Sequence, residues 1–150
     1  MLRLEKITRD NWRAALQLTT NANGEHTLQE EWVPSLAHAL VQSRFEKNWD
    51  VSLITAGNVP VGYAMYGAWP EKDRYVILRF AIDARFQGRG VGQQALPLII
   101  RRVRALYDCE DVYVTFNENN ARAKHIYEKC GFVSTGEKVD GEAVYVLHEN

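Results

Sequence analysis

The residues with the clearest chemical potential form a glycine-rich segment, Gln87-Gly88-Arg89-Gly90-Val91-Gly92. A strand-like apolar run precedes this segment and a long helical pattern follows it, so the segment leads from a strand into a helix. Glycines let a ligand approach the main chain closely, and the first amides of a helix have no partner inside the helix. Together with the helix dipole, such amides bind anions, phosphates in particular. The segment therefore predicts a phosphate-binding turn, to which Arg85 and Arg89 add positive charge.

The same segment is open to other interpretations. A turn that only joins a strand to a helix also uses glycines. A P-loop is excluded, because the chain lacks the pattern G-x-x-x-x-G-K-[ST]. Gly90-x-Gly92-x-x-Ala95 matches the dinucleotide-binding fingerprint, and Glu118 lies about where a ribose-binding acid is expected. The stretch from Asp83 to Gln87 argues against that fold, because it separates the strand from the first glycine, and the antiparallel hairpins before it argue the same way.

A second segment, Asn120 to Phe132, adds to the first. Its initial Asn is followed three positions later by Ala123 and four positions after that by Tyr127, and a Gly-Phe pair closes it. Together the two segments resemble the GNAT superfamily of N-acyltransferases, whose acyl-CoA signature is Gln/Arg-x-x-Gly-x-Gly/Ala after the fourth strand. The resemblance implies an acetyl-CoA-dependent N-acetyltransferase.

The resemblance also implies where acetyl-CoA would bind. The amides of the glycine-rich segment would hold its pyrophosphate, and the backbone of the preceding strand would pair with the pantetheine arm as with an added strand. That pairing requires the strand to part from its neighbour, since its backbone groups would otherwise be occupied. Arg122 and Lys124 would meet the distal phosphates, with solvated surface charge as the alternative. The implied cofactor-binding residues are Phe80, Ala81, Ile82, Gln87, Gly88, Arg89, Gly90, Val91, Gly92, Asn120 and Lys124.

Amide formation places its own demands on the site. A neutral amine must attack the thioester, but an alkyl ammonium has a pKa near ~10.4, so a carboxylate or a water chain must first remove a proton. The resemblance assigns Tyr127 to the last step, in which its hydroxyl donates to the departing thiolate. A phenol of pKa ~10 is a weaker acid than a thiol near ~8.5, so part of this role is hydrogen-bond stabilisation. The alternative is a core aromatic ring with its hydroxyl at the edge.

Acidic and aromatic residues indicate the class of the acceptor. The resemblance places the acceptor pocket beside the helices before the first hairpin and the loop that follows Tyr66. Carboxylates and aromatic rings there suit a cationic amine, through ion pairs and cation–π contacts. Solvated surface acids are the alternative, and Glu30 is also explained as a helix-capping acid. The predicted acceptor-binding residues are Glu25, Glu30, Glu31, Trp32, Tyr66, Glu71 and Asp73.

Shorter segments narrow the resemblance within the superfamily. Residues 61–67 and 78–83, and the closing hairpin around 135–142, look like those of bacterial spermine/spermidine (diamine) acetyltransferases. A polyamine is therefore one hypothesis for the acceptor. Aminoglycosides, peptide N-termini and other metabolite amines stay open, as does a non-catalytic CoA-binding regulatory module.

The elements that must position these residues follow from hydrophobic periodicity and helix caps. Thr27-Leu-Gln-Glu30 is a capping-box pattern that predicts a helix to about Ser43, although Pro34 lies within it. Because antiparallel hairpins alternate with single helices, we expect an α/β (α+β) fold of one domain, 1–150, with a GNAT-like, mixed, mostly antiparallel sheet of about seven strands flanked by about four helices. The predicted strands are 2–7, 51–55, 59–66, 74–83, 112–116, 133–139 and 142–147, and the other predicted helices are 10–18, 90–106 and 121–130.

Composition and charge narrow the function classes. With 18 Lys and Arg against 19 Asp and Glu the net charge is -1, so the basic excess of a nucleic-acid-binding protein is missing. The sequence has neither a signal-peptide pattern nor an apolar run of the roughly 18 residues that suggest a membrane span. We expect its two cysteines to be reduced thiols in the cytoplasm and, since its four histidines lack metal-ligand spacing, we predict no metal. An exposed edge strand at 142–147 predicts a homodimer.

Overall fold

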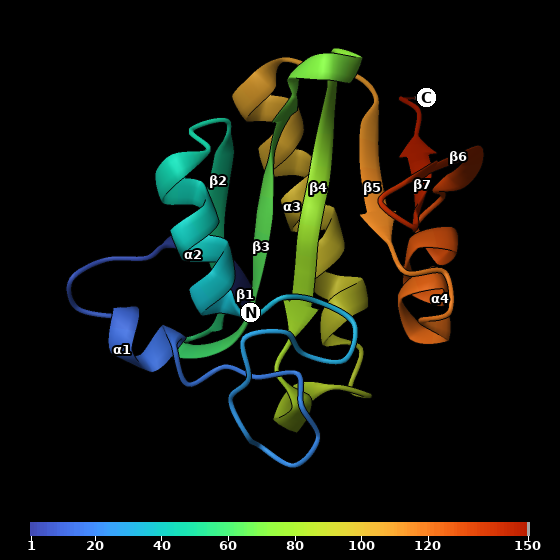
Figure 1. Cartoon of the computed structure of the whole chain (residues 1–150). Coiled ribbons are helices and arrows are strands. Elements are labelled where there is room, and N and C mark those ends of the chain that lie inside the picture. The colour runs from blue at the N-terminus through green and yellow to red at the C-terminus, as the bar shows by residue number, and fades with distance from the viewer. Residues whose placement is uncertain (150) are drawn as a thin grey trace.

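The computed structural model describes residues 1–149 and contains a seven-stranded sheet in the order β1-β2-β3-β4-β5-β7-β6 (Figure 1). Neighbouring strands are antiparallel except β4 and β5, which are parallel. The predicted mixed, mostly antiparallel sheet of an α/β fold is therefore confirmed. The strands are β1 (Leu2–Lys6), β2 (Trp49–Ala56), β3 (Val59–Trp69), β4 (Arg74–Ile82), β5 (Val112–Phe116), β6 (Val133–Val139) and β7 (Glu142–Leu147), and the helices are α1 (Trp12–Ala15), α2 (Leu36–Phe45), α3 (Val91–Tyr107) and α4 (Ala121–Lys129).

Helices cover both faces of the sheet (Figure 1). α3 and α4 pack on one face, where Leu96, Ile99 and Val103 lie in the same core as Ile77 and Val114 of the central strands. The buried residues of α3 recur every three or four positions, which is the amphipathic pattern of a helix that lies on a sheet. α1 and α2 cover the opposite face, and the core there consists of Ala15, Leu18, Leu36, Ala39, Leu53, Tyr63, Met65 and Ala81.

The sheet opens between its two parallel strands. β4 pairs with β3 along its whole length, but with β5 only where Val76 and Ile77 meet Tyr113 and Val114. The next residue of β4, Leu78, has no partner on β3, because the register shifts there by one position. Such a bulge bends a strand and increases its twist. β4 therefore turns away from β5 at the point where their pairing ends, which leaves the rest of that strand edge uncovered.

The predicted helix that starts at a capping box near Thr27 is wrong. Residues 27–34 are irregular, apart from an isolated bridge between Gln29 and Pro34, and α2 begins only at Leu36. Pro34 explains the difference, because a proline within a helix removes a hydrogen bond and its ring clashes with the preceding turn. Ser35 is the actual cap: its hydroxyl accepts from His38 N at 3.2 Å.

The first helix and the sheet edge also differ from the prediction. α1 is a single turn that follows Asn11 and ends at Ala15, whereas the predicted helix ran from Asp10 to Leu18. β7 lies between β5 and β6, so residues 142–147 are not an edge strand; β6 and β1 are the edges of the sheet. A homodimer stays a prediction, and main-chain pairing between two copies would have to use one of those edges.

Candidate active site

The parting of β4 and β5 creates a cavity of about 530 Å³. Leu78 to Ile82 of β4 line one side, and Thr115, Phe116 and the loop up to Asn120 line the other. Because β3 covers only the far edge of β4, main-chain groups on the near edge have no strand partner there. The cavity therefore offers an extended ligand the edge of a strand. The predicted cofactor-binding residues that line it are Phe80, Ala81, Ile82, Gln87 and Asn120.

The glycine-rich segment forms the turn into α3, as its pattern predicts. Gly88 and Gly90 both have φ of +77°, a left-handed conformation that favours glycine. α3 begins after Gly90, and its first main-chain hydrogen bond joins Gln94 N to Gly90 O at 3.1 Å. Within residues 1–149, the amides from Val91 to Gln93 donate to no acceptor. The helix start therefore presents free donors to an anion.

Gln87 joins the glycine turn to both walls of the cavity. Its Nε2 donates to Ile82 O at 2.8 Å, and its Oε1 accepts from Arg122 at the start of α4. Arg122 also lines the cavity, whereas Lys124 and residues 88–92 lie outside the lining. Of the two cations expected near the distal phosphates, the structure places Arg122 in the cavity wall, and a role for Lys124 stays a prediction.

α4 places Tyr127 at the wall of the cavity. The helix begins where Asn120 Oδ1 accepts from Ala123 N at 3.2 Å, so this asparagine already has a capping role. The ring of Tyr127 packs on Phe116 and Phe132, with centroid distances of 4.9 and 5.5 Å. Only 3% of Tyr127 is exposed. The packing thus fixes the ring beside the uncovered part of β4.

Burial determines the acidity of the Tyr127 hydroxyl. Loss of water raises the pKa of Tyr127 above its ordinary value of 10.0, and the nearby negative charge of Glu142 raises this pKa further. The phenol is therefore protonated at neutral pH and able to donate a hydrogen bond. Release of its proton is harder than for an exposed tyrosine, which favours a hydrogen-bonding role over complete proton transfer.

A second cavity of about 650 Å³ adjoins the first. The two share lining residues, among them Glu31, Trp32, Arg79, Thr115 and Glu142. The second cavity is also lined by Trp49, Trp69 and Asp140, so tryptophan rings and carboxylates surround it. Arg79 is its only cationic lining residue within the described part of the chain. The predicted acceptor-binding residues that the structure places here are Glu31 and Trp32.

The other predicted acceptor-binding residues lie outside both cavities. Tyr66 is 1% exposed, because its position on β3 faces the core, and its hydroxyl pairs with Ser52 Oγ at 2.5 Å. Glu25 is exposed in the loop before α2, and Glu71 and Asp73 lie in the turn between β3 and β4. The sequence interpretation missed Arg79, Thr115, Glu142 and Trp49, which line the second cavity from four different strands. No local pattern marks them, since only the strand order brings them together.

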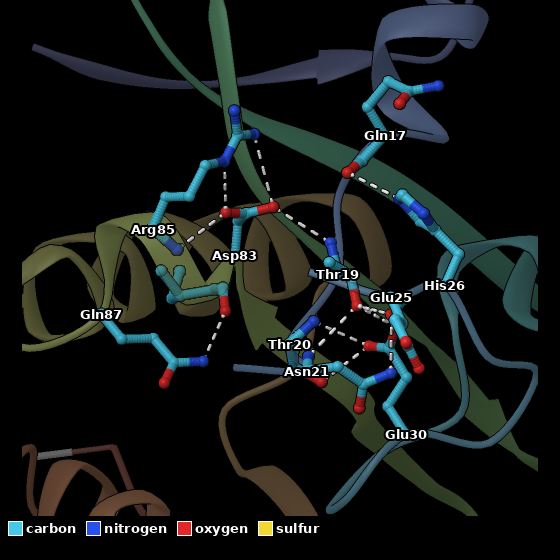
Figure 2. A network of polar contacts seen from close by, with 11 residues as sticks. Gln17, Thr19, Thr20, Asn21, Glu25, His26, Glu30, Asp83, Arg85 and Gln87 are labelled. Atoms are coloured by element: carbon cyan, nitrogen blue, oxygen red, sulfur yellow. Dashed lines mark hydrogen bonds and ion pairs between the residues drawn. The ribbon is translucent and has the colours of Figure 1, made fainter. Parts of the chain in front are cut away.

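Glu30 is part of a network of hydrogen bonds that fixes the loop before α2 (Figure 2). Its carboxylate is buried and accepts from Thr19 Oγ1 at 2.6 Å and from Thr20 N at 2.8 Å. Thr19 N in turn donates to Asp83 Oδ2 at 3.0 Å, directly after β4. Arg85 Nε donates to the same carboxylate at 2.8 Å. The network therefore ties the loop to the turn that carries the glycine-rich segment, and Glu30 is neither a helix cap nor free to bind an amine.

Replacing Asp83 with asparagine is expected to lower the free energy of unfolding by about 2 kcal/mol at pH 7, because a buried charged acceptor with several donors is lost. Burial alone raises the pKa of Asp83, but hydrogen bonds from Arg85 and Thr19 outweigh it and hold the pKa below the ordinary value. Stability from such a depressed pKa is present above the unfolded-state pKa and disappears as the pH falls through the folded-state pKa. Urea denaturation at pH 7 and pH 3 tests this, because the difference in free energy of unfolding between the wild type and Asp83→Asn should be smaller at pH 3. Asp10→Asn, at an exposed carboxylate, is the control and should keep the wild-type free energy of unfolding at both pH values. If Asp83→Asn lost the same free energy of unfolding at pH 7 and at pH 3, the charge of Asp83 would not be what stabilises the network.

The sequence predicted neither a metal site nor a membrane-spanning segment. Within residues 1–149, no group of three or more His, Cys, Asp or Glu side chains is placed to hold a metal ion. No helix in the same range is both long and apolar enough to cross a membrane.

Comparison with known proteins agrees with this geometry. A family model described as Acetyltransferase (GNAT) family matches residues 6–132. Among curated proteins, the Spermine/spermidine N(1)-acetyltransferase of Bacillus subtilis (strain 168) is 33% identical over 153 residues, an alignment that covers 97% of each chain.

Solved structures share the fold. An acetyltransferase from Thermus thermophilus has a TM-score of 0.71 at 24% identity, and the match covers 99% of this chain and 97% of that one. A spermidine N-acetyltransferase from Vibrio cholerae, crystallised with CoA and spermine, has a TM-score of 0.70 at 17% identity, with coverage of 99% and 95%. At these identities the likeness establishes the fold.

Proposed function

Since this chain belongs to the GNAT family of acetyltransferases, we propose that it moves the acetyl group of acetyl-CoA onto a primary amine of a small polycation such as a polyamine. The observation that carries the proposal is the opening between β4 and β5, which lies beside a helix start with free amides. A strand edge suits the amide-bearing pantetheine arm, and the helix start suits the pyrophosphate. The named activity of the Bacillus subtilis relative supports the choice of acceptor.

The residues present fit coenzyme A. The main chain of Phe80 to Ile82, which has no partner on β5, would pair with the pantetheine arm, and the amides from Val91 to Gln93 would meet the phosphates. Arg122 would add charge after releasing Gln87, its present partner. When bound, the cofactor supplies an activated acetyl group. Tyr127 would then hold a hydroxyl hydrogen near the sulfur, where it stabilises the negative charge of the leaving thiolate.

The second cavity supports a cationic acceptor. Trp32, Trp49 and Trp69 line it together with acidic side chains, and aromatic faces attract ammonium groups by cation–π interaction. A linear polyamine carries several ammonium groups, so one can lie at the thioester while another lies among the rings. We therefore assign the distal cation of the acceptor to this second cavity.

Replacing Trp69 with alanine is expected to raise the KM for spermidine roughly 2- to 30-fold, because a cation–π contact of about 0.5–2 kcal/mol is lost. Trp69 lines only the second cavity, so kcat should change little. Steady-state kinetics with spermidine and with a short monoamine measure the effect; the monoamine has no distal cation and its KM should not move. Trp12→Ala removes an exposed tryptophan on α1 and serves as the control. An unchanged spermidine KM contradicts the assignment.

The proposed function is tested by incubating the protein with acetyl-CoA and a panel of amines: spermine, spermidine, an aminoglycoside, a peptide with a free N-terminus and a monoamine. We expect free thiol to be released only when amine is present, fastest with a polyamine, and mass spectrometry to find the acetylated amine. Faster turnover of an aminoglycoside or a peptide would reassign the acceptor. Binding of CoA without thiol release from any amine would indicate a CoA-binding module instead.

A further inference from the structure

We propose that Glu142 binds the attacking ammonium group and accepts its proton, an inference that rests on the proposed function. Glu142 is the first residue of β7 and lines both cavities. Its side chain is 29% exposed, so it is partly withdrawn from water while still accessible from the cavities. A nitrogen held by this carboxylate would lie where the proposed cofactor cavity and the proposed acceptor cavity meet.

The surroundings of Glu142 leave its carboxylate available. The nearest cation is Arg79, whose Nη1 lies 4.0 Å from Glu142 Oε1, beyond hydrogen-bond distance. The titratable, charged or polar groups that face it or lie on the elements packed against it are Arg79 of β4, Thr115 of β5, Tyr127 of α4, Glu137 and Lys138 of β6, Asp140 of the following turn and Glu31 of the loop before α2. Arg79 therefore offsets part of the negative charge of Glu142 without forming a hydrogen bond to its carboxylate.

A buried polar atom beside Glu142 indicates a missing donor. Thr115 is 7% exposed, and its Oγ1 faces the Glu142 carboxylate with lone pairs that no donor within residues 1–149 occupies. Buried polar groups are usually satisfied, so this exception points to a place where a bound donor completes it. An amine satisfies Thr115 Oγ1 and Glu142 by donating to both.

The other carboxylates near the cavities are less suited to this role. Glu30 accepts from Thr19 and Thr20, and Glu137 is paired with Arg74 at 2.7 Å. Glu118 accepts from Tyr145 at 3.3 Å. Glu31 lines both cavities but lies exposed on a loop, where water competes for its carboxylate.

The environment also makes Glu142 a better base than an exposed glutamate. Burial raises the pKa of Glu142, Arg79 and Thr115 oppose this rise, and the charge of Asp140 adds to it. A general base works best when its pKa lies close to the operating pH. The raised pKa therefore moves this carboxylate toward the range in which it accepts a proton from an ammonium group.

The reaction balances with this assignment. One ammonium proton passes to Glu142, and the freed nitrogen lone pair forms the C–N bond at the acetyl carbonyl carbon. As the C–S bond breaks, its electron pair leaves with sulfur. The second proton lost by the nitrogen ends on that sulfur, next to the Tyr127 hydroxyl, and Glu142 returns its own proton to water. No oxidant, reductant or further reactant is needed.

The test compares the pH dependence of kcat with spermidine for the wild type, Glu142→Gln and Glu142→Asp. The glutamine variant is expected to lose about 100-fold in kcat at neutral pH, because it cannot accept a proton. In the wild type, kcat should fall as the pH drops through the pKa of Glu142, and this acid limb should be absent from the glutamine variant. The aspartate variant, which restores a carboxylate, should keep the limb at reduced kcat. The Kd for CoA should be unchanged in both, which also checks that they fold.

Glu110→Gln, at an exposed carboxylate before β5, is the matched control and should keep wild-type kinetics. A glutamine variant that keeps more than a third of wild-type kcat, or that keeps the acid limb, overturns the role of Glu142 and leaves the proposed function standing. Wild-type protein without amine-dependent turnover overturns the proposed function, and the role of Glu142 with it.

Discussion

Tyr127→Phe is expected to lower kcat by about 100-fold while the Kd for CoA stays within about twofold of the wild type. Tyr127 of α4 lines the cavity, and burial keeps its hydroxyl protonated at neutral pH. Phenylalanine keeps the ring that packs on Phe116 and Phe132, so the fold and the walls of the cavity should not change. Only stabilisation of the leaving sulfur is lost. Single-turnover kinetics measures the chemical step, and calorimetry measures CoA binding.

Tyr145→Phe is the control for that experiment. Tyr145 is another buried tyrosine that packs on Phe116, at 4.9 Å, but its hydroxyl donates to Glu118 and it lines neither cavity. Its loss should leave kcat close to the wild-type value. If Tyr127→Phe also left kcat unchanged, the proposed role of Tyr127 would be wrong, and its burial would be explained by core packing alone.

Gly90→Ala is expected to weaken CoA binding by about tenfold or more. Gly90 has φ of +77° at the start of α3, where a residue with a Cβ is strained by roughly 1–2 kcal/mol. No atom lies within 4 Å of the added Cβ, so the fold itself has room for it. The strain is relieved if the turn rotates, and rotation carries the free amides from Val91 to Gln93 away from the phosphates. Calorimetric titration with CoA measures the loss.

Gly136→Ala provides a matched control for backbone strain. Gly136 has φ of +81° and equally open surroundings, but it lies on β6, outside both cavities. Both variants should lose similar thermal stability, whereas only Gly90→Ala should lose affinity for CoA. Equal affinities in the two variants would show that the turn at Gly90 does not hold the cofactor.

Local signals explain why much of the fold was predictable. The strands and the turn at Asp140-Gly141 follow from alternation and glycine chemistry, which act over a few residues. The turn into α3 follows from the glycines at 88, 90 and 92. A local pattern gave the wrong helix start at Thr27. The capping-box residues are present, but Glu30 accepts hydrogen bonds from Thr19 and Thr20 instead. Pro34 prevents the helix from starting before Leu36.

The acceptor side of the site depends on contacts between distant strands, which no local pattern encodes. Tyr66 was predicted to face the acceptor, but strand alternation turns it into the core, where Ser52 meets its hydroxyl. Glu142 looks like an ordinary acid after a hairpin turn. It reaches the cavities because β7 lies beside β5, which makes Thr115 its neighbour. Arg79 of β4 approaches it from the other side of the opening between β4 and β5. Strand order is a property of the whole chain.

Calorimetric titration of the protein with CoA tests most directly whether the uncovered edge of β4 and the start of α3 form a cofactor site. We predict saturable binding of one CoA per chain, with a rise in thermal stability and a clear loss of affinity in Gly90→Ala. Titration to millimolar CoA without heat or stabilisation would contradict the account, and the roles proposed for Tyr127 and Glu142 would fail with it.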